Sequence, residues 1–322
     1  MSSAVRSTLV ESVIPGIAQA DIDSFYQALK SSNRILALCG AGLSAASGLP
    51  TFRGAGGLWR THDAMSLATP EAFAVDPGLV WQFYSYRRHM ALKADPNRAH
   101  FALAELAKRK DFLCISQNVD GLSQRANHPS SSLKLIHGSL FDVKCTDFYC
   151  THTEANFTDP IVPALEIPTI DDREIDPTSN TTREEVDISD INVKLTDVPV
   201  KDLPHCPTCE TGLLRPGVVW FGEALPSATM DSIEDFLSSG PKVDIMLVIG
   251  TSATVHPAAG YIEAARYKGA RIAVINMEDE AAHRSGLDFD RGDWFFRGDA
   301  AKVVPEILKE VIGEDYDVGH GR

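Results

Sequence analysis

Five short apolar runs recur along the chain, and they constrain its fold more than any other feature. They are apolar at nearly every position: RILALC (34–39), FLCIS (112–116), LKLIH (133–137), DIMLVIG (244–250) and RIAVIN (271–276). Strands that are apolar on both faces are buried on both faces, and helical patterns between several of them supply the crossovers that a parallel sheet needs. The sequence therefore predicts an α/β fold with a doubly wound parallel sheet.

The turns that follow these strands carry the residues best suited to bind a ligand. In an open parallel sheet, ligands bind outside the carboxyl ends of the strands. We therefore expect all five turns to face one crevice. They are Gly40-Ala41-Gly42, Gln117-Asn118-Val119-Asp120, His137-Gly138, Gly250-Thr251-Ser252 and Asn276-Met277-Glu278.

Two stretches interrupt the alternation of strands and helices. Residues 51–92 read as a loop followed by helical segments, and residues 143–215 are bracketed by cysteines. Within the second stretch, residues 165–202 are acidic and poor in aromatic residues, so we expect most of this segment to be mobile or loosely ordered. The predicted division is then a helical and loop insertion, a second cysteine-bearing insertion, and a core formed by residues 1–50, 93–142 and 216–322.

Four of the six cysteines have the spacing of a metal site. They form two pairs, with four and two intervening residues: Cys145 and Cys150, then Cys206 and Cys209. Two such pairs suit tetrahedral zinc, and a site closed by four protein ligands is structural. The alternatives are four reduced surface thiols or a redox-active CPTC pair. Cys39 and Cys114 lie inside apolar strands, where we expect them to fill the core.

Composition and charge exclude several classes of protein. With 44% hydrophobic and 23% charged residues among 322, the chain has the composition of a globular protein. Its net charge of −14, without a clustered basic face, argues against nucleic-acid binding. No run approaches the roughly 18 apolar residues of a membrane span. The N-terminal segment resembles neither a secretory signal nor an arginine-rich transit peptide, so we expect an intracellular protein, with mitochondrial matrix and cytosol or nucleus unresolved, and favour a monomer.

The turn after the first strand begins like a dinucleotide-binding motif. CGAGLSAASG can be read as G-x-G-x-x-A, which permits a tight turn and close approach of the backbone to a pyrophosphate. In an ordinary dehydrogenase a full helix follows. Here Gly48-Leu49-Pro50 ends it after about two turns, and a loop with three glycines and two arginines follows. The broken helix favours a flap over the cofactor rather than hydride transfer.

Several motifs together resemble one family. GAGLSAASGLPTFRGAGGLW, QNVDGL, IHGS, the cysteine pairs, GTSATVHPA and INME stand in the order and approximate spacing of the sirtuins, the NAD-dependent protein deacylases, from about residue 33 to 310. This resemblance implies a Rossmann-like large domain and a smaller zinc-binding module. It also implies that NAD, as a consumed co-substrate, and an acyl-lysine of a protein substrate bind in the cleft between them.

The resemblance also assigns the cofactor contacts. The resemblance places the pyrophosphate against Gly40, Ala41, Gly42 and Ser44, and the cofactor loop at Thr51, Phe52, Arg53 and Trp59. The nicotinamide and ribose contacts are Gln117, Asn118 and Asp120, and the second phosphate turn is Gly250, Thr251 and Ser252. The adenosine contacts are Asn276, Glu278, Asp299 and Ala300. Asn118 is in addition assigned to catalysis.

His137 is the predicted catalytic base. Its unperturbed pKa near 6.5 suits a general base at working pH. Taken by itself, a histidine at a strand end more often has a structural role. In the family it resembles, the acyl oxygen displaces nicotinamide from the ribose and the histidine then deprotonates a ribose hydroxyl. The products are free lysine, nicotinamide and O-acyl-ADP-ribose.

The helical pattern WQFYSYRRHM bears on the acyl group. Tyr84 and Arg87 share a helix face, and together they offer a hydroxyl and a planar fork for a carboxylate. They resemble the sirtuins that remove succinyl, malonyl and glutaryl groups, in which a small residue, here Ala64, widens the pocket. The alternative is a surface pair on an amphipathic helix. The strand that would pair with the peptide substrate and cover its acyl chain contains Val219, Trp220, Phe221, Gly222 and Glu223.

Three rival functions remain open at this point. A plain deacetylase would have the same cofactor motifs without the acidic-acyl preference. A catalytically idle NAD-sensing scaffold would use the acidic segment to bind partners. Mono-ADP-ribosyl transfer to protein would use the same cofactor.

Overall fold

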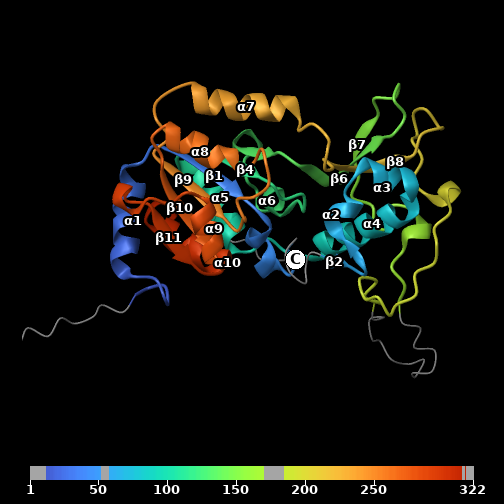
Figure 1. Cartoon of the computed structure of the whole chain (residues 1–322), viewed down its shortest axis with the longest axis horizontal. Helices are drawn as coiled ribbons and strands as arrows, with labels where there is room; N and C mark the ends of the chain where they lie inside the picture. Colours follow the sequence, from blue (N-terminus) through green and yellow to red (C-terminus); the bar gives the residue numbers. More distant parts are fainter. Residues whose placement is uncertain (1–11, 52–57, 170–184, 314–315, 317–322) are drawn as a thin grey trace, which may run out of the picture.

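The computed structural model describes residues 12–51, 58–169, 185–313 and 316. Phe52 and Arg53, two predicted cofactor residues, lie outside the described residues. Two parts are evident: a larger part built on a six-stranded sheet, and a smaller part that contains α2–α4 and β6–β8 (Figure 1).

A six-stranded parallel sheet forms the larger part. Its order is β11-β10-β9-β1-β4-β5, so in chain order the strands lie 3-2-1-4-5-6 and the order reverses between β1 and β9. This is the arrangement of a doubly wound dinucleotide-binding fold, and the predicted fold class is confirmed. The strands are β1 (Arg34–Cys39), β4 (Asp111–Ser116), β5 (Leu133–Leu135), β9 (Ile245–Ile249), β10 (Arg271–Asn276) and β11 (Trp294–Arg297).

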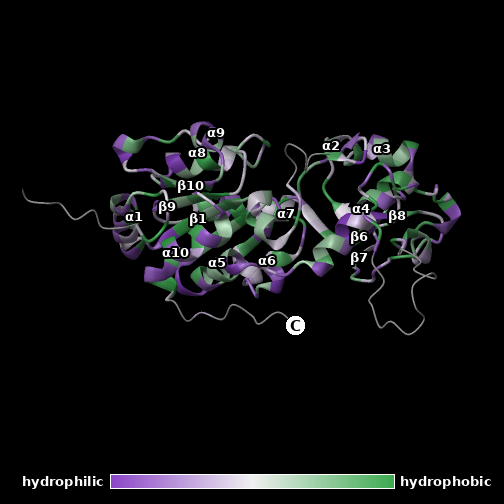
Figure 2. Ribbon diagram, turned by 90° about the horizontal axis from the view of Figure 1, so that it is seen from below, coloured by the Kyte–Doolittle hydropathy of each residue, from purple (hydrophilic) through white to green (hydrophobic). Residues whose placement is uncertain are grey.

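Helices cover both faces of this sheet because alternate residues of each strand point to opposite sides. Ile35, Ala37 and Cys39 of β1 face one hydrophobic cluster, and Leu36 and Leu38 face another. The first cluster includes α1 (Gln19–Ser31), α5 (Arg98–Arg109) and α10 (Ala300–Ile312), and the second includes α7 (Ser227–Ser238) and α8 (Gly260–Tyr267). Figure 2 shows hydrophobic ribbon where the sheet and these helices meet. The remaining helices of the larger part are α6 (Leu122–Arg125) and α9 (Asp279–Arg284).

The smaller part packs helices against a three-stranded antiparallel sheet of order β7-β6-β8. One hydrophobic cluster joins the two insertions, since it contains residues from 59–91 together with residues from 140–220. The elements are the hairpin β2 (Leu58–Trp59) and β3 (His62–Asp63), the helices α2 (Ala64–Leu67), α3 (Pro70–Val75) and α4 (Pro77–Lys93), and the strands β6 (Gly138–Cys145), β7 (Thr153–Ala155) and β8 (Leu214–Val218).

The acidic stretch differs from the sequence-based expectation. In residues 151–169 and 185–203 the chain is organised by turns and short 3₁₀ segments, and Leu165, Ile188 and Leu203 are buried in the smaller part's cluster. Apolar side chains spaced through the acidic sequence thus pack the described residues of 165–202 onto the smaller part at Leu165 and Ile188, which the expectation of loose order did not foresee. The 3₁₀ segments of the chain are Ala41–Leu43, Ala45–Ser47, Ser130–Ser132, Pro163–Leu165, Val200–Asp202 and Phe289–Arg291.

Beyond the five predicted strands, the structure adds β11 to the parallel sheet and β2, β3, β6, β7 and β8 to the smaller part. The strand β11 has only four residues, and β6 runs directly on from the turn at Gly138. Among the described residues, every helix is too short or too polar to serve as a membrane-spanning segment.

Candidate functional site

The turns after β1 and β9 pack backbone against backbone at the point where the strand order reverses. A Cβ on Gly42 would lie 2.7 Å from the Cα of Gly250, and one on Gly40 would lie 2.7 Å from the Cβ of Thr251. Gly250 itself has φ +58°, a conformation that glycine adopts without strain. The Gly42 N–H donates to the Gly250 carbonyl at 2.8 Å. The predicted pyrophosphate turn, which includes Ala41, is thus in direct backbone contact with the predicted second phosphate turn.

The chain beyond this turn does not continue as an α-helix. Two short 3₁₀ segments, 41–43 and 45–47, end at Gly48 with φ +85°. The helix ends where the sequence predicts, and its turns are tighter than expected. Thr51 is partly exposed at the edge of the described residues, and Trp59 is 3% exposed, with its ring edge-on to Phe83 at 5.6 Å.

A hydrogen-bond network links the predicted nicotinamide and ribose residues. Ser44 Oγ donates to Asp120 Oδ2 at 2.7 Å, and Asn118 Nδ2 donates to Ser44 Oγ at 3.2 Å and to the Gly40 carbonyl at 3.0 Å. Gln117 Nε2 donates to Thr251 Oγ1 at 2.9 Å. Side chains from the turns after β1, β4 and β9 therefore lie in one contiguous site.

His100 belongs to this network although its sequence context gives no signal of it. Its Nε2 lies 3.4 Å from Ser44 Oγ, and its Nδ1 accepts from the Asn97 N–H at 3.2 Å. Burial lowers the His100 pKa to about 4 against the opposing charge of Asp120, so the ring is neutral at neutral pH. A histidine inside a regular helical pattern looks like any other helical residue, which is why sequence reasoning missed it.

The predicted adenosine residues occupy the ends of β10 and β11. Asn276 Nδ2 donates to the Thr251 carbonyl at 2.8 Å, and its Oδ1 accepts from the Glu278 N–H at 3.3 Å. Asp299 caps α10 by accepting from the Ala301 N–H at 2.9 Å, next to the buried Ala300. Ser252 lies in the same region, with its Oγ 2.6 Å from Thr254 Oγ1.

His137 is fixed between the two parts of the molecule. It lies two residues beyond β5, and its Nδ1 is 3.1 Å from the Gln117 carbonyl, to which only an N–H can donate. The neutral ring then keeps a lone pair on Nε2. Burial lowers the His137 pKa, and the Gln117 hydrogen bond opposes the shift. The His137 carbonyl accepts from the Val219 N–H at 2.9 Å, which joins the base to the predicted substrate strand.

Tyr84 and Arg87 lie inside the smaller part. Tyr84 is 0% exposed, and its hydroxyl accepts from Trp220 Nε1 at 2.9 Å. The Arg87 guanidinium carbon lies 5.4 Å from the Phe83 ring centroid and 5.6 Å from that of Tyr84. Burial lowers the Arg87 pKa, with Tyr84 and Asp120 opposing the shift. The burial of Tyr84 contradicts the alternative of a surface pair.

The predicted substrate strand is not a strand at residues 219–223, because β8 ends at Val218 and these residues form a turn, which an ion pair holds. Glu223 accepts from Arg215 Nη1 at 2.5 Å and from the Trp220 N–H at 2.8 Å, and the guanidinium stacks 3.2 Å from the Trp220 ring centroid. The Phe221 N–H donates to the Ala68 carbonyl, and Gly222 has φ +89°. Ala64, at the start of α2, is 4% exposed.

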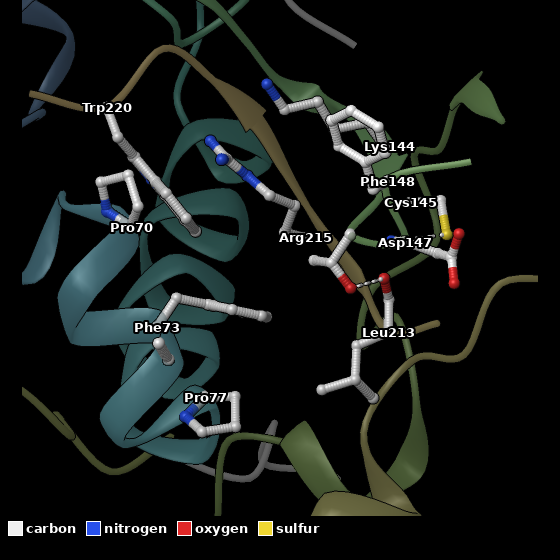
Figure 3. A pocket seen from close by; sticks show the side chains of 12 residues that line it. Pro70, Phe73, Pro77, Lys144, Cys145, Asp147, Phe148, Leu213, Arg215 and Trp220 are labelled. Carbon is white, nitrogen blue, oxygen red and sulfur yellow. Dashed lines mark hydrogen bonds between the residues drawn. The ribbon is translucent and has the colours of Figure 1, made fainter. Parts of the chain in front are cut away.

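A cleft of about 640 Å³ lies behind Trp220 (Figure 3). Its walls are α3, the end of β6 with the turn that follows it, and β8, and they carry Pro70, Phe73, Lys144, Phe148 and Arg215. None of the predicted catalytic or cofactor residues lines it. The Trp220 indole also packs against Tyr84, with ring centroids 6.3 Å apart.

The four predicted metal ligands converge. Their sulfur atoms lie within 4.8 Å of one another, and the sulfur of Cys145 is 3.6 Å from that of Cys209. Backbone N–H groups donate to three of the sulfurs, as that of Gly212 does to Cys209 Sγ at 3.3 Å. The N–H groups of Gly212 and Thr211 lower the Cys209 pKa, which favours the thiolate that binds zinc, whereas burial raises the pKa of Cys145 in the same cluster. Four clustered thiols fit a closed tetrahedral zinc site, and Cys39 and Cys114 are buried in the core as expected.

Comparisons with known proteins agree with this site. The model of the Sir2 family matches residues 40–257. An NAD-dependent protein deacylase of Candida albicans is 47% identical over 91% of this chain and 98% of its own length. The mitochondrial NAD-dependent protein deacylase sirtuin-5A of Xenopus laevis is 40% identical over 95% of this chain and 90% of its own. A solved Sir2 homologue in complex with NAD superimposes with a TM-score of 0.69 at 33% identity, covering 90% of this chain and 93% of the other. The chain belongs to the Sir2 family.

Proposed function

We propose that this chain is an NAD-dependent protein lysine deacylase that removes short acyl groups ending in a carboxylate, such as succinyl, malonyl and glutaryl. Family membership and the deacylase relatives support the enzyme class. The acyl preference rests on one observation, the buried Tyr84 beside the Arg87 guanidinium.

The environment of Arg87 favours a carboxylate ligand. Burial lowers its pKa because desolvation penalises the charged form, and aromatic rings of Phe83 and Tyr84 face the guanidinium. A carboxylate supplied by the substrate would form a charge-assisted pair and offset that penalty. An acetyl group has no such charge. Arg87 is therefore expected to discriminate between acyl groups.

The polar network fits the groups of NAD. The glycine turns after β1 and β9 would admit the pyrophosphate, and Gln117, Asn118 and Asp120 would meet the nicotinamide riboside. NAD, when bound, supplies an electrophilic ribose carbon with nicotinamide as its leaving group. His137 Nε2, basic because Nδ1 donates to the Gln117 carbonyl, would accept a proton from a ribose hydroxyl. Zinc held by four cysteines keeps no open position for substrate and serves structure alone.

The proposal also covers the substrates, the oligomeric state, the location and the domain division. Acylated proteins are the substrates, and we favour a monomer that binds neither nucleic acid nor membrane. We propose an intracellular location, and the mitochondrial sirtuin-5 relatives favour the mitochondrion. The division into residues 1–50, 93–142 and 216–322, the insertion 51–92 and the zinc-binding module 143–215 also stays a proposal.

The decisive experiment compares acetyl-, succinyl- and glutaryl-lysine peptides with wild type and Arg87→Met. The variant should lose about a hundredfold in kcat/KM on succinyl-lysine, on the order of 3 kcal/mol, and keep its activity on acetyl-lysine. Equal losses on both peptides would refute the acyl assignment and favour a deacetylase. His137→Ala is the companion control: formation of O-acyl-ADP-ribose at the wild-type rate would contradict the role of the base, which acts after nicotinamide has left.

A further inference from the structure

Arg60 holds a segment of the second insertion that we call the limb, residues 188–193. Its Nη1 donates to the carbonyls of Ile188 at 3.0 Å and Asp190 at 2.8 Å, and its Nη2 donates to those of Ile191 at 3.2 Å and Val193 at 2.7 Å. All four acceptors are backbone atoms, so the contact depends on the path of the limb rather than on its side chains. A planar guanidinium can serve four acceptors in this way, whereas an ammonium has only three donors.

The position of Arg60 is costly for its backbone. It occupies the turn between β2 and β3 with φ +58°, where glycine is preferred over any residue with a Cβ. An arginine at such a position makes its contribution through the side chain. The observed contribution is the clamp on the limb.

The limb is anchored in the smaller part by its first two residues, whereas residues 190–192 are exposed. Ile188 is 5% exposed within the hydrophobic cluster, and the Tyr86 hydroxyl donates to Ser189 Oγ at 3.4 Å. Both contacts join the limb to α4: Tyr86 is a residue of that helix, and Ile188 packs in the hydrophobic cluster that includes it. The clamp therefore ties the hairpin to a fixed support.

The hairpin leads directly to the proposed acyl pocket. Trp59, adjacent to Arg60, packs edge-on against Phe83 at 5.6 Å, and the Arg87 guanidinium lies over the same Phe83 ring at 5.4 Å. On the other side of the turn, β3 runs into α2, whose first residue is Ala64. A displacement of the hairpin would therefore change both the width of the acyl pocket and the position of the Arg87 guanidinium.

We propose that Arg60 is a positioning residue for acyl selectivity, which acts by clamping the limb to the hairpin that supports the acyl pocket. The second insertion thereby becomes part of the support of the active site. This inference rests on the proposed preference for acidic acyl groups. It assigns Arg60 no contact with either substrate.

Arg60→Gly provides the test because glycine keeps the left-handed turn free of strain while the guanidinium is removed. We expect the KM for a succinyl-lysine peptide to rise about tenfold, with kcat and the acetyl-lysine KM changed less than about twofold. Arg60→Lys, which keeps the charge and three donors, should fall between wild type and Arg60→Gly. The matched control is Asn127→Gly, an exposed residue of the larger part with φ +58°, which should leave both KM values unchanged.

The outcomes separate this inference from the function on which it rests. If wild type favours succinyl-lysine and Arg60→Gly raises both KM values equally, or neither, the positioning role is refuted alone. If wild type favours acetyl-lysine, the acyl assignment fails and this inference fails with it. If Arg60→Gly does not fold, Arg60→Lys decides: an unchanged ratio of succinyl to acetyl KM overturns the proposal, and a raised ratio supports it.

Discussion

The two parts of the molecule satisfy their backbones by different means. In the larger part, strands such as β1 and β9 are buried at every position and pair in register with their neighbours. In the smaller part, long side chains also satisfy carbonyls of short strands and of the loop after β7: Arg88 bonds those of Leu140, Asn156 and Thr158, and Trp81 bonds that of Leu214. Regular pairing distributes stability over many weak bonds, whereas the smaller part concentrates it in a few side chains and one cysteine cluster.

The largest expected effect follows from removal of one metal ligand. Cys206→Ser should abolish zinc binding and unfold the smaller part, because binding to a structural site contributes on the order of 10 kcal/mol to folding. Zinc content by elemental analysis and deacylase activity should both fall nearly to zero. This outcome is expected because the hydrophobic cluster of the smaller part is not sufficient to fold it without zinc.

Cys114→Ala is the matched control in the larger part. Cys114 is 1% exposed within β4 and lies outside the metal cluster. We expect full zinc content and a loss of about 1 kcal/mol in the free energy of unfolding, the cost of a small cavity. A Cys206→Ser variant that keeps its activity and its thermal transition would show that the smaller part does not depend on zinc.

A second, smaller effect compares two buried arginines. Arg88→Met leaves the buried carbonyl of Leu140 without its donor, and we expect a loss of about 3 kcal/mol in urea unfolding. Arg34→Met in β1 should cost about 1 kcal/mol, because its two carbonyl acceptors, those of Pro241 and Phe236, lie at an exposed and a half-buried residue and can turn to water. Equal losses would remove the distinction drawn between the two parts.

The smallest effect concerns a surface contact and depends on pH. Glu185 binds Lys93 Nζ at 2.6 Å and His89 Nε2 at 2.9 Å, and these two partners lower its pKa. A lowered carboxyl pKa contributes stability above the unfolded pKa, and the contribution is lost as the pH falls through the folded pKa. Glu185→Gln should therefore cost a few tenths of a kcal/mol to about 1 kcal/mol at pH 7. The difference should begin to shrink as the pH falls below the ordinary glutamate pKa, about 4.3, and should vanish only below the lowered pKa of the folded state.

Glu105→Gln is its counterpart in the larger part. Burial raises the Glu105 pKa, but hydrogen bonds from Arg109 and Lys108 on the same helix outweigh it and lower the pKa. We expect Glu105→Gln also to lower the free energy of unfolding at pH 7, by about 0.3–0.5 kcal/mol. The Glu185 contact joins residues 92 positions apart, so a Glu185 effect below that of Glu105 would argue against a role in holding the insertion.

Local patterns predicted much of the larger part and part of the site. Continuous apolar runs reveal strands buried on both faces, and polar turns after them reveal the ligand-binding edge. The four-residue β11 was missed because its run is too short to show a pattern. His100 was missed because a helical residue becomes part of a polar network only through the turn that packs on it.

The sequence by itself determined the parallel sheet, the turns at its ligand-binding edge and the two cysteine pairs, because each is encoded by neighbouring residues. The tertiary structure alone decided that Tyr84 is buried rather than exposed, that the acidic stretch is ordered where it is described, and that Arg60 clamps the limb. These outcomes depend on hydrogen bonds and packing between residues more than a hundred positions apart. A local pattern carries no information about such partners.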